Sequence, residues 1–157
     1  MGSAILKLPI EVRNRRSQLR IVVADDNIDA AVSLARLLEL SGFSMVAVVH
    51  TGPAALEAVL RHRPEVALLD IALPEMDGYQ IARTVRERLG QQTRLIAVTG
   101  LARHSDREDA CEAGFDEHFV KPMDWGDVEH LLDVYAGQFP EHEASGKREQ
   151  GVPMKAR

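Results

Sequence analysis

The sequence predicts an α/β fold: a three-layer sandwich in which helices cover both faces of a five-stranded parallel sheet. Short apolar runs of strand length alternate with longer stretches whose apolar residues recur at helical spacing, and this strand-then-helix pattern occurs five times. Helices that connect consecutive strands imply parallel pairing and right-handed crossovers, which place the helices on both sides of the sheet.

The predicted strands are short apolar runs bounded by polar or turn-forming residues. Two of them, 66–69 and 95–98, are apolar throughout, as expected for strands that are covered on both faces. The five strands are expected at 21–24, 45–49, 66–69, 95–98 and 118–120.

Local signals mark the ends of the predicted helices. The first helix follows Asp26 and ends before Gly42, since glycine readily adopts the left-handed cap conformation. The second helix spans 54–61 and is stopped by Pro64. The third is expected at 81–89, the fourth between Ser105 and Gly114, and the fifth after Asp124.

Both ends of the chain differ from this pattern. Residues 1–18 are interpreted as a linker or the remnant of an upstream domain: 4–10 look strand-like but have no place in the sheet, and 11–20 carry four arginines. Residues 19–136 are the predicted folded domain. Residues 137–157 are rich in Gly, Glu, Lys and Pro, which predicts a disordered tail.

Composition and charge narrow the functional class. The formal net charge of −5 over 157 residues argues against nucleic acid as a partner, because that needs clustered Lys and Arg. A single cysteine, Cys111, excludes an internal disulfide and suits a reducing compartment. Because no apolar stretch approaches the roughly 20 residues of a membrane span, we expect a cytoplasmic domain with no membrane contact.

Polar side chains follow four of the predicted strands at the point where each ends. They are Asp25 and Asp26, Asp70, Thr99 and Lys121. The carboxyl ends of strands in an open parallel sheet converge on one crevice, so these groups are expected to share a pocket. Three carboxylates can bind a hard divalent cation, and an aspartate can accept a phosphoryl group as an aspartyl-phosphate.

Each of these residues also has a purely structural interpretation. One of Asp25 and Asp26 can cap the following helix, and Asp70 can be a turn or cap residue. A threonine at a strand end and a solvated lysine before a proline are common in loops. The functional interpretation therefore rests on the whole set and its placement.

Four segments carry a more specific pattern: Ile21–Asn27, Leu68–Gly78, Ala97–Gly100 and Ala113–Pro122. Together they resemble the receiver domain of two-component response regulators over residues 19–136. The resemblance implies a flavodoxin-like receiver fold with strand order 2-1-3-4-5.

The resemblance also assigns a metal site. Asp26 and Asp70 match direct ligands of Mg²⁺ (or Mn²⁺), and Asp25 matches a ligand that acts largely through water. The backbone carbonyl of Ala72 matches the third protein ligand.

The phosphoryl chemistry follows from the same resemblance. Asp70 matches the phosphoacceptor, Thr99 the switch hydroxyl and Lys121 the lysine that pairs with phosphate. His118 is a departure, because many members carry Tyr or Phe at this position and their ring moves when the hydroxyl engages the phosphate.

The expected function is that of a phosphorelay signalling domain. A histidine kinase or histidine phosphotransfer domain would supply the phosphoryl group from phosphohistidine, and phosphorylation would change affinity for a downstream protein target that the sequence does not name. The domain would catalyse its own phosphorylation and a slow autodephosphorylation, and the chain has no kinase core.

Two other functions are alternatives to this expectation. A phosphohydrolase with an Asp nucleophile usually carries a second acid two residues further on, where this chain has Ala72. A receiver-like module that binds partners without phosphorylation would not need the acidic set and Lys121.

The N-terminal residues suggest a hybrid sensor histidine kinase as the source of the domain. Residues 2–10 look like the closing strand of a histidine-kinase ATPase domain, which would make this the C-terminal receiver of a longer protein. The alternative is that Met-Gly-Ser is a cloning scar and the short apolar segment a coincidence.

Overall fold

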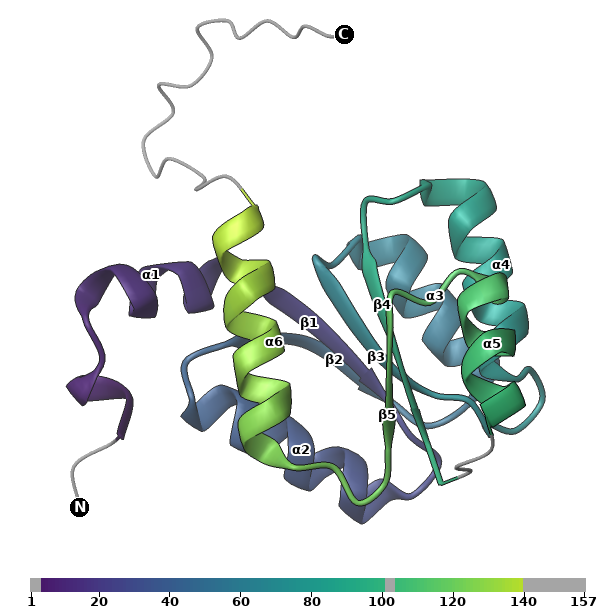
Figure 1. The fold of residues 1–157 in the computed structure, drawn as a ribbon, viewed down its shortest axis with the longest axis horizontal. Helices are drawn as coiled ribbons and strands as arrows, with labels where there is room; N and C mark the ends of the chain where they lie inside the picture. Colours follow the sequence, from purple (N-terminus) through teal and green to yellow (C-terminus); the bar gives the residue numbers. More distant parts are fainter. Residues whose placement is uncertain (1–3, 101–103, 140–157) are drawn as a thin grey trace, which may run out of the picture.

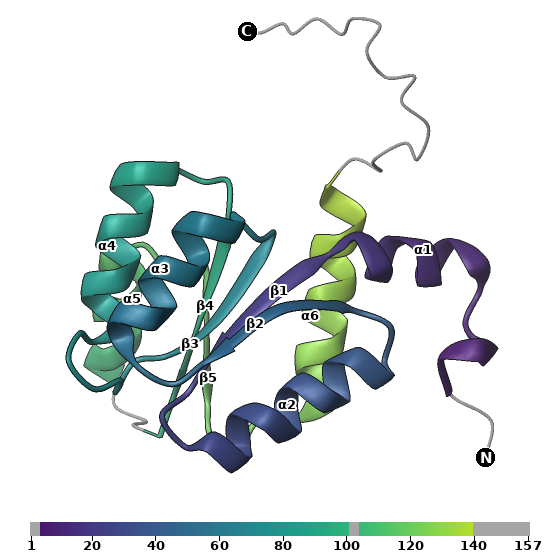
Figure 2. The same cartoon turned by 180° about the vertical axis from the view of Figure 1, so that it is seen from behind.

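The structure, a computed structural model, describes residues 4–100 and 104–139, which form a sheet flanked by helices (Figure 1, and from behind in Figure 2). The strands are β1 (Arg20–Ala24), β2 (Ser44–Val49), β3 (Val66–Asp70), β4 (Arg94–Thr99) and β5 (Glu117–Val120). All neighbouring strands are parallel in the order β2-β1-β3-β4-β5, which confirms the predicted fold.

Helices follow each strand, as predicted. They are α2 (Ile28–Leu40), α3 (Gly52–His62), α4 (Gly78–Leu89), α5 (His104–Ala113) and α6 (Trp125–Gln138). Helices α3, α4 and α5 cover one face of the sheet, and α2 and α6 cover the other (Figure 1; Figure 2). Within the described ranges, no helix combines the length and apolarity that crossing a membrane requires.

The central strands divide their side chains between two apolar cores. In β1, Val22 and Ala24 belong to the core under α3 and α4, whereas Ile21 and Val23 belong to the core under α2 and α6. This division follows from the two-residue period of a strand. Burial on both faces explains why these strands are continuous apolar runs in the sequence.

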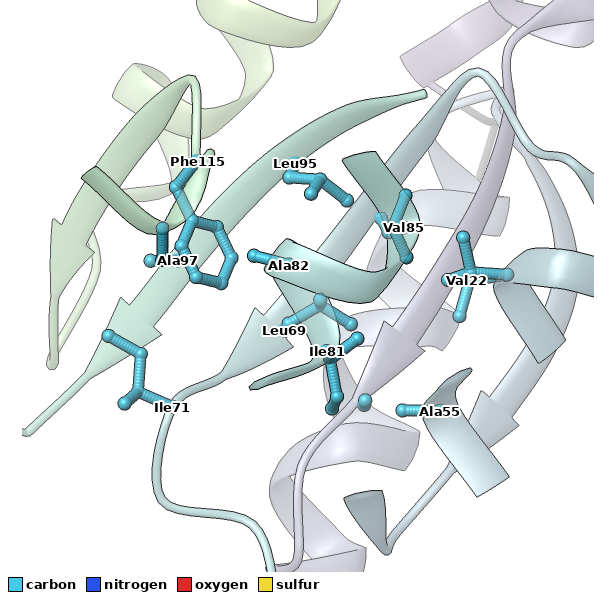
Figure 3. Close-up of a cluster of buried hydrophobic side chains, with 14 of the residues drawn as sticks. Val22, Ala55, Leu69, Ile71, Ile81, Ala82, Val85, Leu95, Ala97 and Phe115 are labelled. Carbon is cyan, nitrogen blue, oxygen red and sulfur yellow. The ribbon is translucent and has the colours of Figure 1, made fainter. Parts of the chain in front are cut away.

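Figure 3 shows the first of these cores at close range. Leu69 and Leu95 project from the sheet toward Ile81 and Val85 of α4, and Phe115 closes the side next to α5. These five residues are buried, and none exposes more than 6% of its surface. Their packing holds the strand ends at fixed positions relative to one another.

Side chains at the helix starts explain where the helices begin. Asn27 accepts a hydrogen bond from the N–H of Ala30 at 3.0 Å, and Asp124 accepts one from the N–H of Asp127 at 3.3 Å. Such caps pair N–H groups that have no partner within the helix. The predicted stop at Gly42 is also present, with a φ of 99° that favours glycine.

The N-terminal segment differs from the sequence prediction. In place of a strand-like segment over 4–10 and a linker over 11–20, the chain forms the 3-10 helix η1 (Ala4–Lys7) and the α-helix α1 (Ile10–Gln18). Glu11 in the first turn and Arg15 in the last suit the helix dipole. Helix α6 extends to Gln138, two residues into the segment 137–157 that was predicted as a tail. Residues 140–157 lie outside the described residues.

Arg16 connects α1 to the rest of the domain. It is only 3% exposed and donates two hydrogen bonds to the carboxylate of Asp133 on α6, at 2.8 and 2.7 Å. A further nitrogen donates to the carbonyl of Ser41 and lies 3.0 Å from Glu129, and the guanidinium stacks over the Phe43 ring. One buried side chain thus joins α1, α6 and the end of α2.

Replacing Arg16 by methionine tests this connection. We expect Arg16→Met to lower the free energy of unfolding by about 1–3 kcal/mol, because charged hydrogen bonds are lost while Asp133 keeps partial access to water. Urea unfolding monitored by circular dichroism measures the change. The matched control is Arg15→Met on the exposed side of α1; equal losses for the two variants would contradict the role of Arg16.

Candidate functional site

The sheet register brings the predicted site residues to the carboxyl end of the sheet. Ala24 of β1 pairs with Leu69 of β3, one residue before Asp70, and Thr99 of β4 pairs with Val120 of β5. The residues at the ends of these strands and just after them therefore lie together at the carboxyl end of the sheet.

Three aspartates form an acidic cluster at the carboxyl end of the sheet. Asp25, Asp26 and Asp70 each offer a carboxylate oxygen, and these oxygens lie within 4.8 Å of one another. Asp25 and Asp70 are 8% and 6% exposed, whereas Asp26 is exposed. Carboxylates gathered this closely repel one another, and a bound cation relieves the repulsion.

Lys121 is the positive charge inside the acidic cluster. Its Nζ donates hydrogen bonds to Asp25 at 2.8 Å and to Asp70 at 3.1 Å. Burial of the Lys121 ammonium lowers its pKa, but the bonds to the two carboxylates outweigh this effect, so the pKa lies above its ordinary value. The peptide bond to Pro122 is cis.

Burial dominates the electrostatics of Asp70. Burial raises the pKa of the Asp70 carboxyl above its ordinary value, and the charge of Asp25 acts in the same direction. The N–H of Ala72, which donates to the carboxylate at 2.9 Å, and the ammonium of Lys121 both oppose this shift. Asp70 thus remains a partly desolvated carboxylate beside a cation.

Backbone contacts fix Asp25 in the loop between β1 and α2. Its N–H donates to the carbonyl of Val49, and its carboxylate accepts a bond from the N–H of Asn27 at 2.9 Å. The Nδ1 atom of His50 lies 3.0 Å from its carbonyl oxygen. The sequence held no signal for this contact, because the six histidines show no spacing typical of a shared site.

Two close backbone contacts hold the loop that follows Asp70. The N–H of Gly78 donates to the carbonyl of Ile71 at 2.8 Å, and the N–H of Gly52 donates to the carbonyl of Pro74 at 3.0 Å. A Cβ atom at Gly52 would lie 1.9 Å from the carbonyl oxygen of Met76, so only glycine fits there. Ala72 lies on this loop, and its carbonyl as a metal ligand stays a prediction.

Thr99 lies beside the cluster on β4. It is 1% exposed, and its carbonyl accepts the N–H of Lys121 at 2.8 Å. This bond positions the lysine relative to the threonine. The structure therefore brings together the side chains of the three aspartates and Lys121, and it links Thr99 to Lys121 through the backbone. The switch role of the Thr99 hydroxyl stays a prediction.

A separate hollow of about 350 Å³ lies between α5 and β5 and is lined by Cys111, Phe115 and His118, among others. It contains none of the three aspartates and not Lys121. Because phosphoryl transfer needs positioned charge rather than a deep cavity, we place the candidate site at the acidic cluster.

The acidic cluster suits a small oxygen-seeking cation. Three carboxylates and one ammonium leave a formal charge of −2 by count, and Mg²⁺ and Mn²⁺ both prefer oxygen ligands. The exposure of Asp26 leaves one side of the cluster open to water. Magnesium usually keeps several waters, so an open side agrees with this ion.

Comparison with known proteins gives consistent matches. The family model for the response regulator receiver domain matches residues 21–133. The response regulator MprA of Mycobacterium avium is 33% identical over 105 residues, which cover 67% of this chain and 45% of that protein. The chain therefore spans about half the length of this curated relative.

Solved structures show the same fold. The signal receiver domain of the putative response regulator NarL from Mycobacterium tuberculosis is similar with a TM-score of 0.71 and 32% identity, over 76% of this chain and 98% of that one. The receiver domain of the sensor histidine kinase PA1611 from Pseudomonas aeruginosa PAO1 has a TM-score of 0.68 and 28% identity, with the same coverage of each chain. That structure has a magnesium ion coordinated in its active-site cleft.

The raised pKa of Asp70 predicts a pH-dependent effect of Asp70→Asn on stability. A carboxyl with a raised pKa binds its proton more tightly when folded, so its contribution to stability falls as pH rises from about 4 through the folded pKa. In metal-free buffer, we therefore expect the free energy of unfolding of Asp70→Asn to increase relative to that of the wild type as pH rises over this range. Chemical denaturation at each pH measures the two free energies.

The matched control is Asp109→Asn, which removes an exposed carboxylate from α5. A difference between Asp70→Asn and the wild type that stays constant with pH, or falls as pH rises, would contradict the raised pKa of Asp70.

Proposed function

This chain belongs to the response regulator receiver domain family, and we propose that Asp70 is its phosphoacceptor in two-component signalling. The observation that carries this assignment is the placement of Lys121, whose ammonium contacts both Asp25 and Asp70 within the acidic cluster. A carboxylate beside a fixed cation, at the carboxyl end of the sheet, suits attack on a phosphoryl group.

The proposed reaction transfers a phosphoryl group from a phosphohistidine. An oxygen of Asp70 forms a bond to phosphorus while the P–N bond breaks, and the imidazole leaves with the electron pair. Lys121 offsets negative charge on the phosphoryl oxygens. Catalysis of this kind depends mainly on positioning and charge neutralisation.

The groups proposed to hold Mg²⁺ or Mn²⁺ are the carboxylates of Asp25, Asp26 and Asp70 and the carbonyl of Ala72. When bound, the ion supplies charge neutralisation at the phosphoryl oxygens. The mutual proximity of the three carboxylates supports this assignment. So does the magnesium ion in the similar PA1611 receiver domain.

Thr99 and Lys121 are proposed to sense the phosphorylated state. Thr99 ends β4 beside the cluster, where a hydroxyl can donate to a phosphoryl oxygen. Its carbonyl already accepts the N–H of Lys121, so a change at one residue reaches the other. The added negative charge would shift the loops after Asp70 and Thr99 between two states.

Receiver domains interact with histidine kinases and phosphotransfer proteins, and one of these is the proposed phosphoryl donor here. The similar structures include receivers of response regulators and of a sensor kinase. Placement after a kinase core in a hybrid protein and a cytoplasmic location therefore stay predictions, as does the identity of the downstream protein.

Labelling with acetyl phosphate tests the acceptor. We expect the wild type to form a magnesium-dependent, hydroxylamine-sensitive label and Asp70→Asn to form none, because an amide does not attack phosphorus in this way. Intact-protein mass spectrometry measures the adduct. Asp109→Asn should label like the wild type, and labelling of Asp70→Asn at the wild-type level would overturn the assignment.

Magnesium should stabilise the folded domain. An ion that binds only the folded state stabilises it by about 2.7 kcal/mol at a hundredfold excess over its dissociation constant. We expect MgCl₂ to raise the melting temperature of the wild type, and Asp26→Asn to lose most of this rise. An equal rise with NaCl at matched ionic strength would exclude a specific site.

A further inference from the structure

The short segment between β2 and α3, His50–Gly52, touches both loops that carry the acidic cluster. On one side, the ring of His50 contacts the carbonyl of Asp25 in the loop after β1. On the other side, Gly52 donates to the carbonyl of Pro74 in the loop after Asp70. Three consecutive residues thus contact both of the loops that carry the proposed metal ligands.

The contact at His50 defines the direction of its hydrogen bond. Nδ1 lies 3.0 Å from the carbonyl oxygen of Asp25, and a carbonyl oxygen can only accept. Nδ1 must therefore carry the proton in this contact, which selects one of the two neutral tautomers of the ring. His50 is half-buried, so the ring does not sample solvent freely.

The position of the accepting carbonyl makes this bond important for the cluster. The carbonyl of Asp25 belongs to the peptide group that joins Asp25 to Asp26. The preceding peptide group is held by the bond from the N–H of Asp25 to the carbonyl of Val49. The end of β2 and the residue after it therefore hold the peptide groups on both sides of Asp25.

We propose that His50 is a positioning residue for the acidic cluster, holding the Asp25–Asp26 peptide group so that both carboxylates face Asp70. The proposal rests on the proposed function for the identity of the cation, and on the hydrogen bond alone for the role of the histidine. Without the bond, the Asp25–Asp26 peptide group loses its partner on this side, and repulsion among the three carboxylates favours turning it away from Asp70.

Loss of a residue that orients metal ligands typically weakens metal binding 10–100-fold. The bond from the Asp25 N–H to the Val49 carbonyl remains, and so do the bonds that the Asp25 carboxylate accepts from Asn27 and Lys121. We therefore expect the lower end of this range, roughly tenfold, for Mn²⁺ as the probe. The overall fold has its own support from the two apolar cores, so the melting temperature of the metal-free protein should change little.

The first experiment reads the histidine directly in metal-free protein. Long-range ¹H–¹⁵N correlation spectra at mildly alkaline pH, where imidazole is neutral, should show His50 with its proton on Nδ1. His50→Asn identifies the signal by its absence. A proton on Nε2 would overturn the proposal, and this result does not depend on phosphorylation or on any metal.

The second experiment compares three variants by Mn²⁺ binding, measured by electron paramagnetic resonance. His50→Phe keeps a ring but has no donor, and should bind roughly tenfold more weakly. His50→Asn places an amide N–H donor where Nδ1 was, and should recover most of the affinity. His130→Phe makes the same change at an exposed histidine on α6 and should match the wild type.

The outcomes separate this proposal from the proposed function. If the wild type binds Mn²⁺ and labels on Asp70 while His50→Phe binds as tightly, only the positioning role is wrong. If His50→Asn is as weak as His50→Phe, the ring rather than its donor matters, and the proposal also fails. If the wild type neither binds Mn²⁺ nor labels, the proposed function fails, while the tautomer of His50 still tests the hydrogen bond.

Discussion

The ion contact of Lys121 with Asp25 and Asp70 is the interaction on which the site depends. Three carboxylates within 4.8 Å of one another are unfavourable without compensation, and two of them are largely removed from water. The ammonium lies 2.8 and 3.1 Å from the two buried carboxylates and offsets part of that repulsion. The remaining negative charge makes the cluster attractive to a divalent cation.

The scaffold keeps these charges together by fixing backbone rather than by enclosing a cavity. Parallel strands with apolar cores on both faces set the positions at which the site loops begin. The loop after Asp70 is then held at Gly52 and Gly78, where a neighbouring segment approaches too closely for a side chain. The site is thus rigid at its base, and the exposed Asp26 leaves it accessible from outside.

The sequence was sufficient for the five strands, the five helices that follow them and the side chains of the acidic cluster, because apolar periodicity and polar residues at strand ends are local signals. The strand order came only from the family resemblance, since spacing does not order strands. Helix α1 was missed because its stability comes from the distant Asp133, which pairs with Arg16. The contact of His50 was missed because a single histidine after a strand has no characteristic spacing.

The docking of α1 through Arg16 has a practical consequence for chimeric proteins. The family match begins at residue 21, and a crossover point chosen there would separate Arg16 from Asp133 and uncover the ring of Phe43. The transplanted domain would then carry Glu129 and Asp133 on α6 without the arginine that pairs with them. A fusion joint ahead of Pro9 keeps that helix and its guanidinium with the module they pack against.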